Sequence, residues 1–196
     1  MADPPPSVDW RGKGVLPPVR NQGMTSLSGA IAVVEAIEAL AAIKTGKLLS
    51  LSVQEVVTCC SRLSVDVYTC IKDIRGLALD DVYPRDATTC LSKNYKPAAT
   101  ISGGSFVTSK DERELALALA KQPVVIAVDA GRQSFMEYRG GVYSDSRCNA
   151  TMIDHNMLLV GYTEDSWICQ NSWGKYIERN FLKNVFKMSL QVHHGG

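Results

Sequence analysis

Residues 21–46 read NQGMTSLSGAIAVVEAIEALAAIKTG, and the long apolar run inside this stretch decides how the chain folds. The run begins at Ser28 and is rich in Ala, Ile, Val and Leu, with Glu35 and Glu38 as its only charged interior positions. Because it is apolar on more sides than a surface helix, it predicts a buried central helix over 28–44, stopped by the glycine that ends the stretch. Ser28 has three interpretations: a nucleophile, a helix cap, or the remnant of a lost active site.

Outside this stretch, helical patterns come first along the chain and strand patterns follow. Ser52 offers a hydroxyl cap with Glu55 three residues later, which predicts a second helix from that point. Further helices are expected over 69–76 and 112–122. Strand-like β-branched runs occupy residues 123–128, 140–144, 155–163 and 166–172. This order predicts an α+β fold, with one helical part and one antiparallel sheet or barrel.

Composition and charge exclude several classes of function. The chain has 196 residues and is 45% hydrophobic, enough for one good core or two small lobes. Its 21 basic and 20 acidic residues are balanced and scattered, so we expect no nucleic-acid partner. No apolar stretch approaches the roughly 20 residues of a membrane span. No secretory signal is visible, and we expect no membrane partner.

The cysteines suit an oxidising compartment. There are six of them, and spacing alone leaves fifteen complete pairings open. A zinc site is the rival interpretation, but the sequence has no C-x-x-C pair, and His155 is its only histidine outside residues 193–194. We therefore expect no metal and no cofactor. The sequon that begins at Asn149 fits a secreted or vacuolar protein.

Four separated motifs occur in a fixed order: VDWRGKGVLPPVRNQG at 8–23, the helix from Ser28, IDHNMLLVGY at 153–162 and QNSWG at 170–174. This order and wording resemble the papain-like cysteine proteases. The resemblance implies a two-lobed papain-like fold, with a central helix in a helical lobe and an antiparallel β-barrel-like second lobe. It implies one domain over 1–196, with the helical lobe at about 10–110 and the β-rich lobe at about 111–196.

The resemblance also implies an active site. Gln22 matches the glutamine that helps to form the oxyanion hole, and His155 matches the general base paired with the nucleophile. Asn171 matches the asparagine that orients the imidazole, and Trp173 matches the tryptophan that shields this contact. An imidazole needs a second polar partner to fix its tautomer, and a side-chain amide can donate to a developing oxyanion. Each residue alone would be read as structural, but their shared order favours descent from a catalytic site.

The first motif departs from the family pattern Q-G-x-C-G-S-C-W-A-F. Thr25 stands where a disulfide cysteine is expected, Ser28 takes the place of the nucleophilic cysteine, and Gly29 replaces the tryptophan after it. The family's G-C-x-G-G stretch, which supplies the partner cysteine and binds substrate backbone, has no match after the second helix. The segment after residue 174 also lacks the usual G-W-G-x-x-G-Y. Several replaced positions together indicate natural divergence of the site.

The resemblance implies that Cys59 pairs with Cys90, and we expect Cys60 and Cys70 to form a local replacement for the missing bridge. The two other cysteines are expected as thiols: Cys148, whose family partner has no match here, and Cys169, which lies inside a strand-like run.

The residues that match the family's second substrate pocket are Ala127, Ile153 and Asn156. Ala127 and Ile153 would give an apolar floor suited to a hydrophobic side chain.

The replacement at Ser28 decides the expected function. A thiol is acidic enough for histidine and a helix N-terminus to hold it as a thiolate, whereas a serine hydroxyl is not. We therefore expect a papain-like homologue that has lost peptide-bond hydrolysis, a pseudoprotease, with a binding, defence or storage role. The alternative is a weakly active endopeptidase that uses Ser28 with His155 and Asn171. Expected partners are a peptide or protein ligand in the cleft, including a protease inhibitor, and the expected location is secreted or vacuolar/lysosomal.

Overall fold

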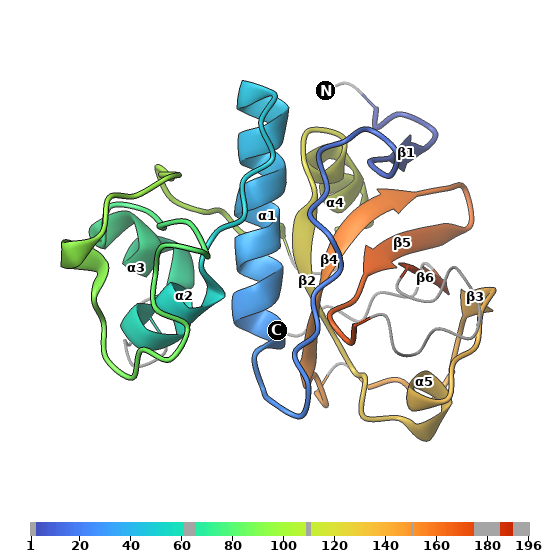
Figure 1. Cartoon of the computed structure of the whole chain (residues 1–196). Coiled ribbons are helices and arrows are strands. Elements are labelled where there is room, and N and C mark those ends of the chain that lie inside the picture. The colour runs from blue at the N-terminus through green and yellow to red at the C-terminus, as the bar shows by residue number, and fades with distance from the viewer. Residues whose placement is uncertain (1–2, 61–65, 109–110, 150, 175–184, 190–196) are drawn as a thin grey trace.

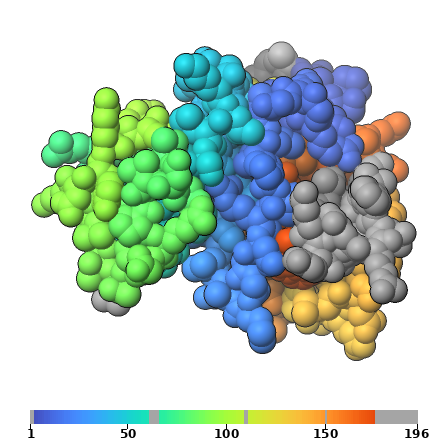
Figure 2. All heavy atoms as spheres, in the orientation of Figure 1, coloured from blue at the N-terminus to red at the C-terminus, as the bar shows by residue number. Residues whose placement is uncertain are grey.

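A computed structural model describes residues 3–60, 66–108, 111–149, 151–174 and 185–189. Helices α2 and α3 lie on one side of the molecule and a sheet lies on the other, with α1 running between them (Figure 1). In the space-filling view the residues after α2, in green, form one bulge and the strands, in orange and yellow, belong to the other (Figure 2). The N-terminal residues, in blue, run between them. This arrangement is the two-lobed α+β fold that the sequence predicts.

Helix α1 spans Ser28–Thr45, which confirms the predicted central helix. Its face around Ala36 packs against the sheet residues Leu158 and Ile168, while Val34 on another face belongs to the core of the helical part. Gly46 ends the helix in the left-handed conformation (φ 71°), and its N–H donates to the Ala42 carbonyl at 2.9 Å. The helix is buried on both sides because one face packs against the helical part of the molecule and the other packs against the sheet.

Helices α2 (Val53–Cys60) and α3 (Val67–Asp73) complete the helical part, with a short 3-10 helix η1 at Ser92–Asn94. Of the two hydrogen bonds in the predicted capping box at Ser52, one is present: Ser52 Oγ accepts from the Glu55 N–H at 3.1 Å. The Glu55 carboxylate does not return the bond to that cap and instead accepts from the Ala78 N–H at 2.7 Å. Helix α3 begins two residues before the predicted start, because Asp66 caps it through the N–H groups of Tyr68 and Thr69.

The strands β1 (Val8–Asp9), β2 (Val124–Val128), β3 (Val142–Tyr143), β4 (His155–Tyr162), β5 (Ser166–Gln170) and β6 (Val185–Ser189) form one sheet. Its order is β1-β4-β5-β6-β3, and β2 also pairs with β4. The pairs are antiparallel except β3 with β6, which run parallel. Strand β6 was not predicted, yet it pairs with β5 along its whole length.

Two short helices accompany the sheet: α4 (Glu112–Leu119) and α5 (Gln133–Met136). Helix α4 ends a turn earlier than the predicted 112–122. Leu115 and Leu119 of α4 pack into the same core as Met157 and Leu159 of β4. Within the described residues, none of the helices is long and apolar enough to cross a membrane.

Two disulfides lie in the helical part of the molecule. Cys59 is bonded to Cys90 and Cys60 to Cys70, so both implied pairings are present. The two other cysteines, Cys148 and Cys169, carry thiols. Cys169 lies wholly inside the sheet core, and burial raises the pKa of its thiol.

Candidate active site

His155 and Asn171 come together because they stand at the ends of neighbouring strands. His155 is the first residue of β4 and Asn171 directly follows β5, its antiparallel neighbour. His155 Nε2 lies 2.7 Å from Asn171 Oδ1. The Ser172 N–H donates to the same oxygen at 2.8 Å, which fixes the orientation of the amide. An oxygen at this position requires a proton on Nε2, so the neutral ring keeps Nδ1 as a proton acceptor.

Trp173 covers the His155–Asn171 pair. Its ring centroid lies 5.2 Å from that of the imidazole at an interplanar angle of 43°, and Phe135 packs against Trp173 in a T-shaped arrangement. His155 and Asn171 are both buried. Burial lowers the pKa of His155, and the hydrogen bond to Asn171 acts in the opposite direction. Desolvation is therefore the dominant effect on the pKa of this ring.

Ser28 does not act as a helix cap. The N-cap residue is Leu27, and α1 receives no hydrogen bond from a capping side chain. Ser28 is itself buried, and its Oγ accepts a hydrogen bond from the Asn156 N–H on β4 at 3.3 Å. Among the described residues, no hydrogen bond joins this hydroxyl to the His155 ring. Of the three interpretations of Ser28, the cap is therefore wrong.

Gln22 is held by its own loop and by the segment after Asn171. Its N–H donates to the Ser172 carbonyl at 2.8 Å, and the Ser172 hydroxyl donates to Gln22 Oε1 at 2.6 Å. Gln22 Nε2 donates to the Thr25 carbonyl at 2.8 Å, while the Thr25 hydroxyl donates to the Gln22 carbonyl. The amide nitrogen that would face an oxyanion thus has one of its two N–H groups bonded within the loop.

Two buried acidic side chains of α1 hold the loop that contains Gln22 and the end of strand β5 against the helix. Both terminal nitrogens of Arg20 bind Glu38, at 2.7 and 2.6 Å, and so hold the chain two residues before Gln22. Gln170 donates to Glu35 at 3.3 Å, which holds the residue before Asn171. Burial raises the pKa of Glu35 to about 8. No role for this network was predicted from the sequence, although two acidic residues inside an apolar helix were the signal for it.

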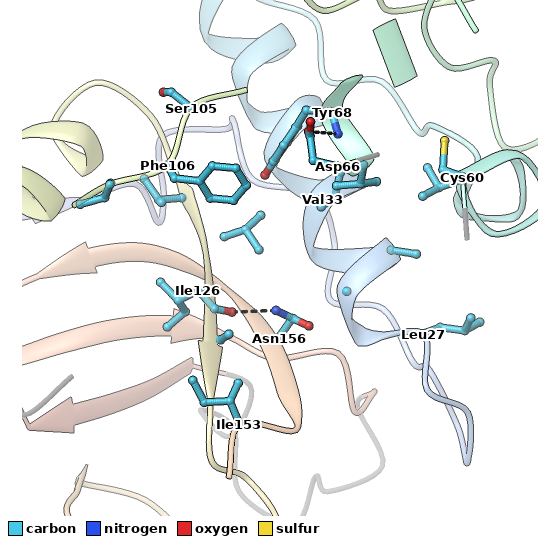
Figure 3. A pocket seen from close by; sticks show the side chains of 18 of the residues that line it. Leu27, Val33, Cys60, Asp66, Tyr68, Ser105, Phe106, Ile126, Ile153 and Asn156 are labelled. Atoms are coloured by element: carbon cyan, nitrogen blue, oxygen red, sulfur yellow. Dashed lines mark hydrogen bonds between the residues drawn. The ribbon is translucent and has the colours of Figure 1, made fainter. Parts of the chain in front are cut away.

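A pocket of about 930 Å³ lies beside Ser28, between α1, α2 and β2 (Figure 3). The predicted substrate residues Ala127, Ile153 and Asn156 all line it. Gly29 lines it as well, and a Cβ at this position would meet the Asn156 Oδ1 at 3.2 Å. The structure therefore brings these residues together next to His155, which directly precedes Asn156 on β4. As for metals, the described residues contain no cluster of three or more His, Cys, Asp or Glu that could hold an ion.

Comparison with known proteins identifies similar sequences and folds. The family model described as papain family cysteine protease matches residues 4–189. The senescence-specific cysteine protease SAG12 of Arabidopsis thaliana is 38% identical over 195 residues, which cover 91% of this chain and 56% of that protein. Vignain of Ricinus communis is also 38% identical and is covered to 54% of its length, against 91% of this chain. The chain thus spans about half the length of these curated relatives.

Solved structures show the same fold. A Carica candamarcensis cysteine protease in complex with E-64 superposes with a TM-score of 0.83 at 32% identity, covering 94% of this chain and 89% of that one. The bromelain protease of Ananas comosus, in complex with the same inhibitor, has a TM-score of 0.84 at 29% identity, with 97% and 92% covered.

Proposed function

The chain belongs to the papain family of cysteine proteases, and we propose that this member is a pseudoprotease that binds a ligand in its cleft without hydrolysing it. One observation carries the proposal. By the family resemblance Ser28 takes the nucleophile's position, and among the described residues its oxygen accepts a hydrogen bond from the Asn156 N–H and makes none to His155. A hydroxyl reacts as a nucleophile only if a base removes its proton during attack, and that transfer needs the imidazole within hydrogen-bond reach, directly or through one water.

Two further features support the loss of hydrolysis. Burial lowers the pKa of His155, so the ring is a weaker base for the Ser28 proton and is less able to carry the positive charge that it gains on accepting that proton. Gln22 directs an amide N–H to the Thr25 carbonyl, which competes with its donation to an oxyanion. Removing one donor from an oxyanion hole costs about 100- to 1000-fold in turnover in a serine protease. The base, the nucleophile and the oxyanion donor are thus each weakened.

A second candidate function is weak endopeptidase activity by Ser28 with His155 and Asn171. It is favoured by the intact contact between His155 and Asn171, 2.7 Å long and covered by Trp173. For this activity the hydroxyl and the imidazole would have to move into hydrogen-bond contact. This candidate predicts slow hydrolysis that disappears in Ser28→Ala.

The cleft ligand that we propose is a peptide or protein, including a protease inhibitor, in a defence or storage setting. The complexes of structural neighbours with E-64 support an inhibitor-sized ligand in this type of cleft. The two disulfides support a secreted or vacuolar/lysosomal location, because such bonds persist in oxidising compartments. We also propose that residues 1–196 act as one domain, with lobes at about 10–110 and 111–196.

The test uses fluorogenic peptides and a thiol-directed epoxide inhibitor. The unmodified protein is expected to give no hydrolysis and no covalent labelling. Ser28→Cys is expected to be labelled, because a thiol at the helix N-terminus beside His155 meets the requirements for trapping. Ser28→Cys combined with His155→Ala is the matched control and should lose the label. Robust hydrolysis by the unmodified protein that Ser28→Ala abolishes would refute the proposal.

A further inference from the structure

The pocket beside Ser28 has apolar walls contributed by several elements. Leu27 precedes α1 as its N-cap, Val33 comes from α1, Val56 from α2 and Ile126 from strand β2. The volume of about 930 Å³ lies near the upper end of the range for small-molecule sites, which is about 300–1,000 Å³. Figure 3 shows Phe106, Tyr68 and Asn156 around one common space. The lining favours a ligand with a large apolar body.

Gly29 opens the wall of this pocket on the α1 side. A Cβ added there would have only side-chain atoms of Asn156 within 4 Å, outside the glycine's own neighbours and helix. The family pattern has a tryptophan at this position, which is far bulkier than glycine. A side chain here would begin at the pocket wall, beside Asn156.

Two aromatic rings border the pocket opposite Asn156. Tyr68 of α3 and Phe106 of the segment before α4 extend toward each other across the pocket (Figure 3). Tyr68 is fixed by Gly104, where a Cβ would stand 2.5 Å from its ring. Phe106 is 81% exposed, an unfavourable state for an aromatic ring that a bound apolar molecule would relieve. These rings form a natural contact surface for an apolar ligand.

Charge limits the polar part of the ligand. Among the described lining residues there is no lysine, arginine or histidine, and Asp66 is the single charged side chain. Its carboxylate caps α3, and hydrogen bonds from Thr69 lower its pKa, so it is ionised at neutral pH. A carboxylate or phosphate on the ligand would find no cation and would be repelled. An uncharged hydroxyl has a partner in the Asn156 amide, whose Oδ1 faces Gly29 and whose Nδ2 donates to the Ile126 carbonyl at 3.4 Å.

We propose that the pocket binds an uncharged lipid-like small molecule, whose apolar body lies between α1 and β2 and whose hydroxyl meets Asn156. The proposal rests on the proposed function, because it treats the cleft as a binding site that does not cleave. The pocket is one part of the cleft, so a lipid-like molecule here is a second ligand beside the peptide or protein proposed for the cleft as a whole. The side chains of Val33, Val56 and Leu27 contact its apolar body and need no hydrogen bond from it.

The experiment measures binding of the neutral dye Nile red by fluorescence and its displacement at pH 7.5. Dodecanol is expected to displace the dye at a concentration at least about tenfold lower than dodecanoate, because only the latter places a charge in an apolar site. Gly29→Trp is expected to lower dye affinity at least about tenfold by filling the pocket, and Phe106→Ala to lower it measurably. Leu48→Trp, a substitution of an exposed residue outside the pocket, is the matched control and should change nothing.

Three outcomes would overturn the inference: equal affinity in the unmodified protein, Gly29→Trp and Phe106→Ala; equal displacement by dodecanol and dodecanoate; or stronger displacement by a blocked hydrophobic dipeptide than by dodecanol. Phe106 is exposed, so its substitution tests the pocket even if Gly29→Trp does not fold. Peptide hydrolysis by the same preparation, measured in parallel, would refute the proposed function instead. The two failures therefore have separate readouts.

Discussion

Replacing Glu35 by glutamine should remove a large part of the pH dependence of stability. Glu35 lies on α1 with 1% of its surface exposed, 3.7 Å from Arg20 and hydrogen-bonded to Gln170. Burial raises the pKa of its carboxyl from 4.5 to about 8. Between these values the unfolded chain has lost the proton and the folded chain still holds it. Raising the pH therefore favours unfolding across this window. The contribution of Glu35 to the free energy of unfolding is complete below about pH 4.5 and is lost by about pH 8.

The size of the effect follows from the width of the window. A pKa difference of about 3.5 corresponds to at most about 5 kcal/mol, or about 1.4 kcal/mol for each pH unit. Relaxation around the buried charge and the nearby Arg20 make the measured value smaller. Glu35→Gln resembles the protonated carboxyl in shape and charge, so it should match the unmodified protein near pH 4.5. Its advantage should grow steadily toward pH 8.

Urea unfolding followed by tryptophan fluorescence at pH 5, 6, 7 and 8 measures this difference. The matched control is Glu164→Gln, the same chemical change at an exposed turn, which should run parallel to the unmodified protein. Parallel curves for Glu35→Gln and the unmodified protein over the whole window would refute the assignment of a retained proton to Glu35.

Other substitutions test the remaining features. Arg20→Met should cost about 3–5 kcal/mol in unfolding free energy by chemical denaturation, because it leaves the buried Glu38 without its cation; a loss under 1 kcal/mol would show that this pair is not needed. Changing Cys60 and Cys70 together to serine should cost about 2.5 kcal/mol for a separation of 10 residues, with Tm as the readout, and an unchanged Tm would argue against the bond. The His155 imidazole, followed by NMR, should titrate in one step below the ordinary 6.5, whereas a value above 6.5 would contradict its burial.

The sequence predicted the elements whose pattern depends on local composition. Helix α1 was predicted to within one residue because its apolar run and terminal glycine both act locally. The strand that contains His155 and the strand before Asn171 were visible as β-branched runs, and family order brought them together. Strand β6 was missed because its residues gain their strand conformation from pairing with β5 and β3, which no local pattern encodes.

Contacts made by side chains far apart in sequence were beyond prediction. The Ser28 hydroxyl accepts a bond from a backbone N–H 128 residues away, and nothing in its neighbourhood indicated this partner. Glu55 was read as part of a local cap, yet its carboxylate binds the Ala78 N–H, 23 residues on. In both cases the side-chain oxygen accepts from a backbone N–H that is distant in sequence, rather than from one in its own helix. Folding brings this buried N–H, which needs a partner, beside the oxygen.

The closed loop at Gln22 and Thr25 has a consequence for how the protein withstands its chemical surroundings. In the family pattern a disulfide closes this loop. An oxidant is needed to form that bond, and a thiol reductant can break it. Here two residues close it by exchanging hydrogen bonds between side chains and backbone carbonyls. Such bonds form again each time the chain refolds and need no enzyme or redox partner. The loop should thus keep its shape in glutathione or dithiothreitol, conditions that would release its counterpart in a relative.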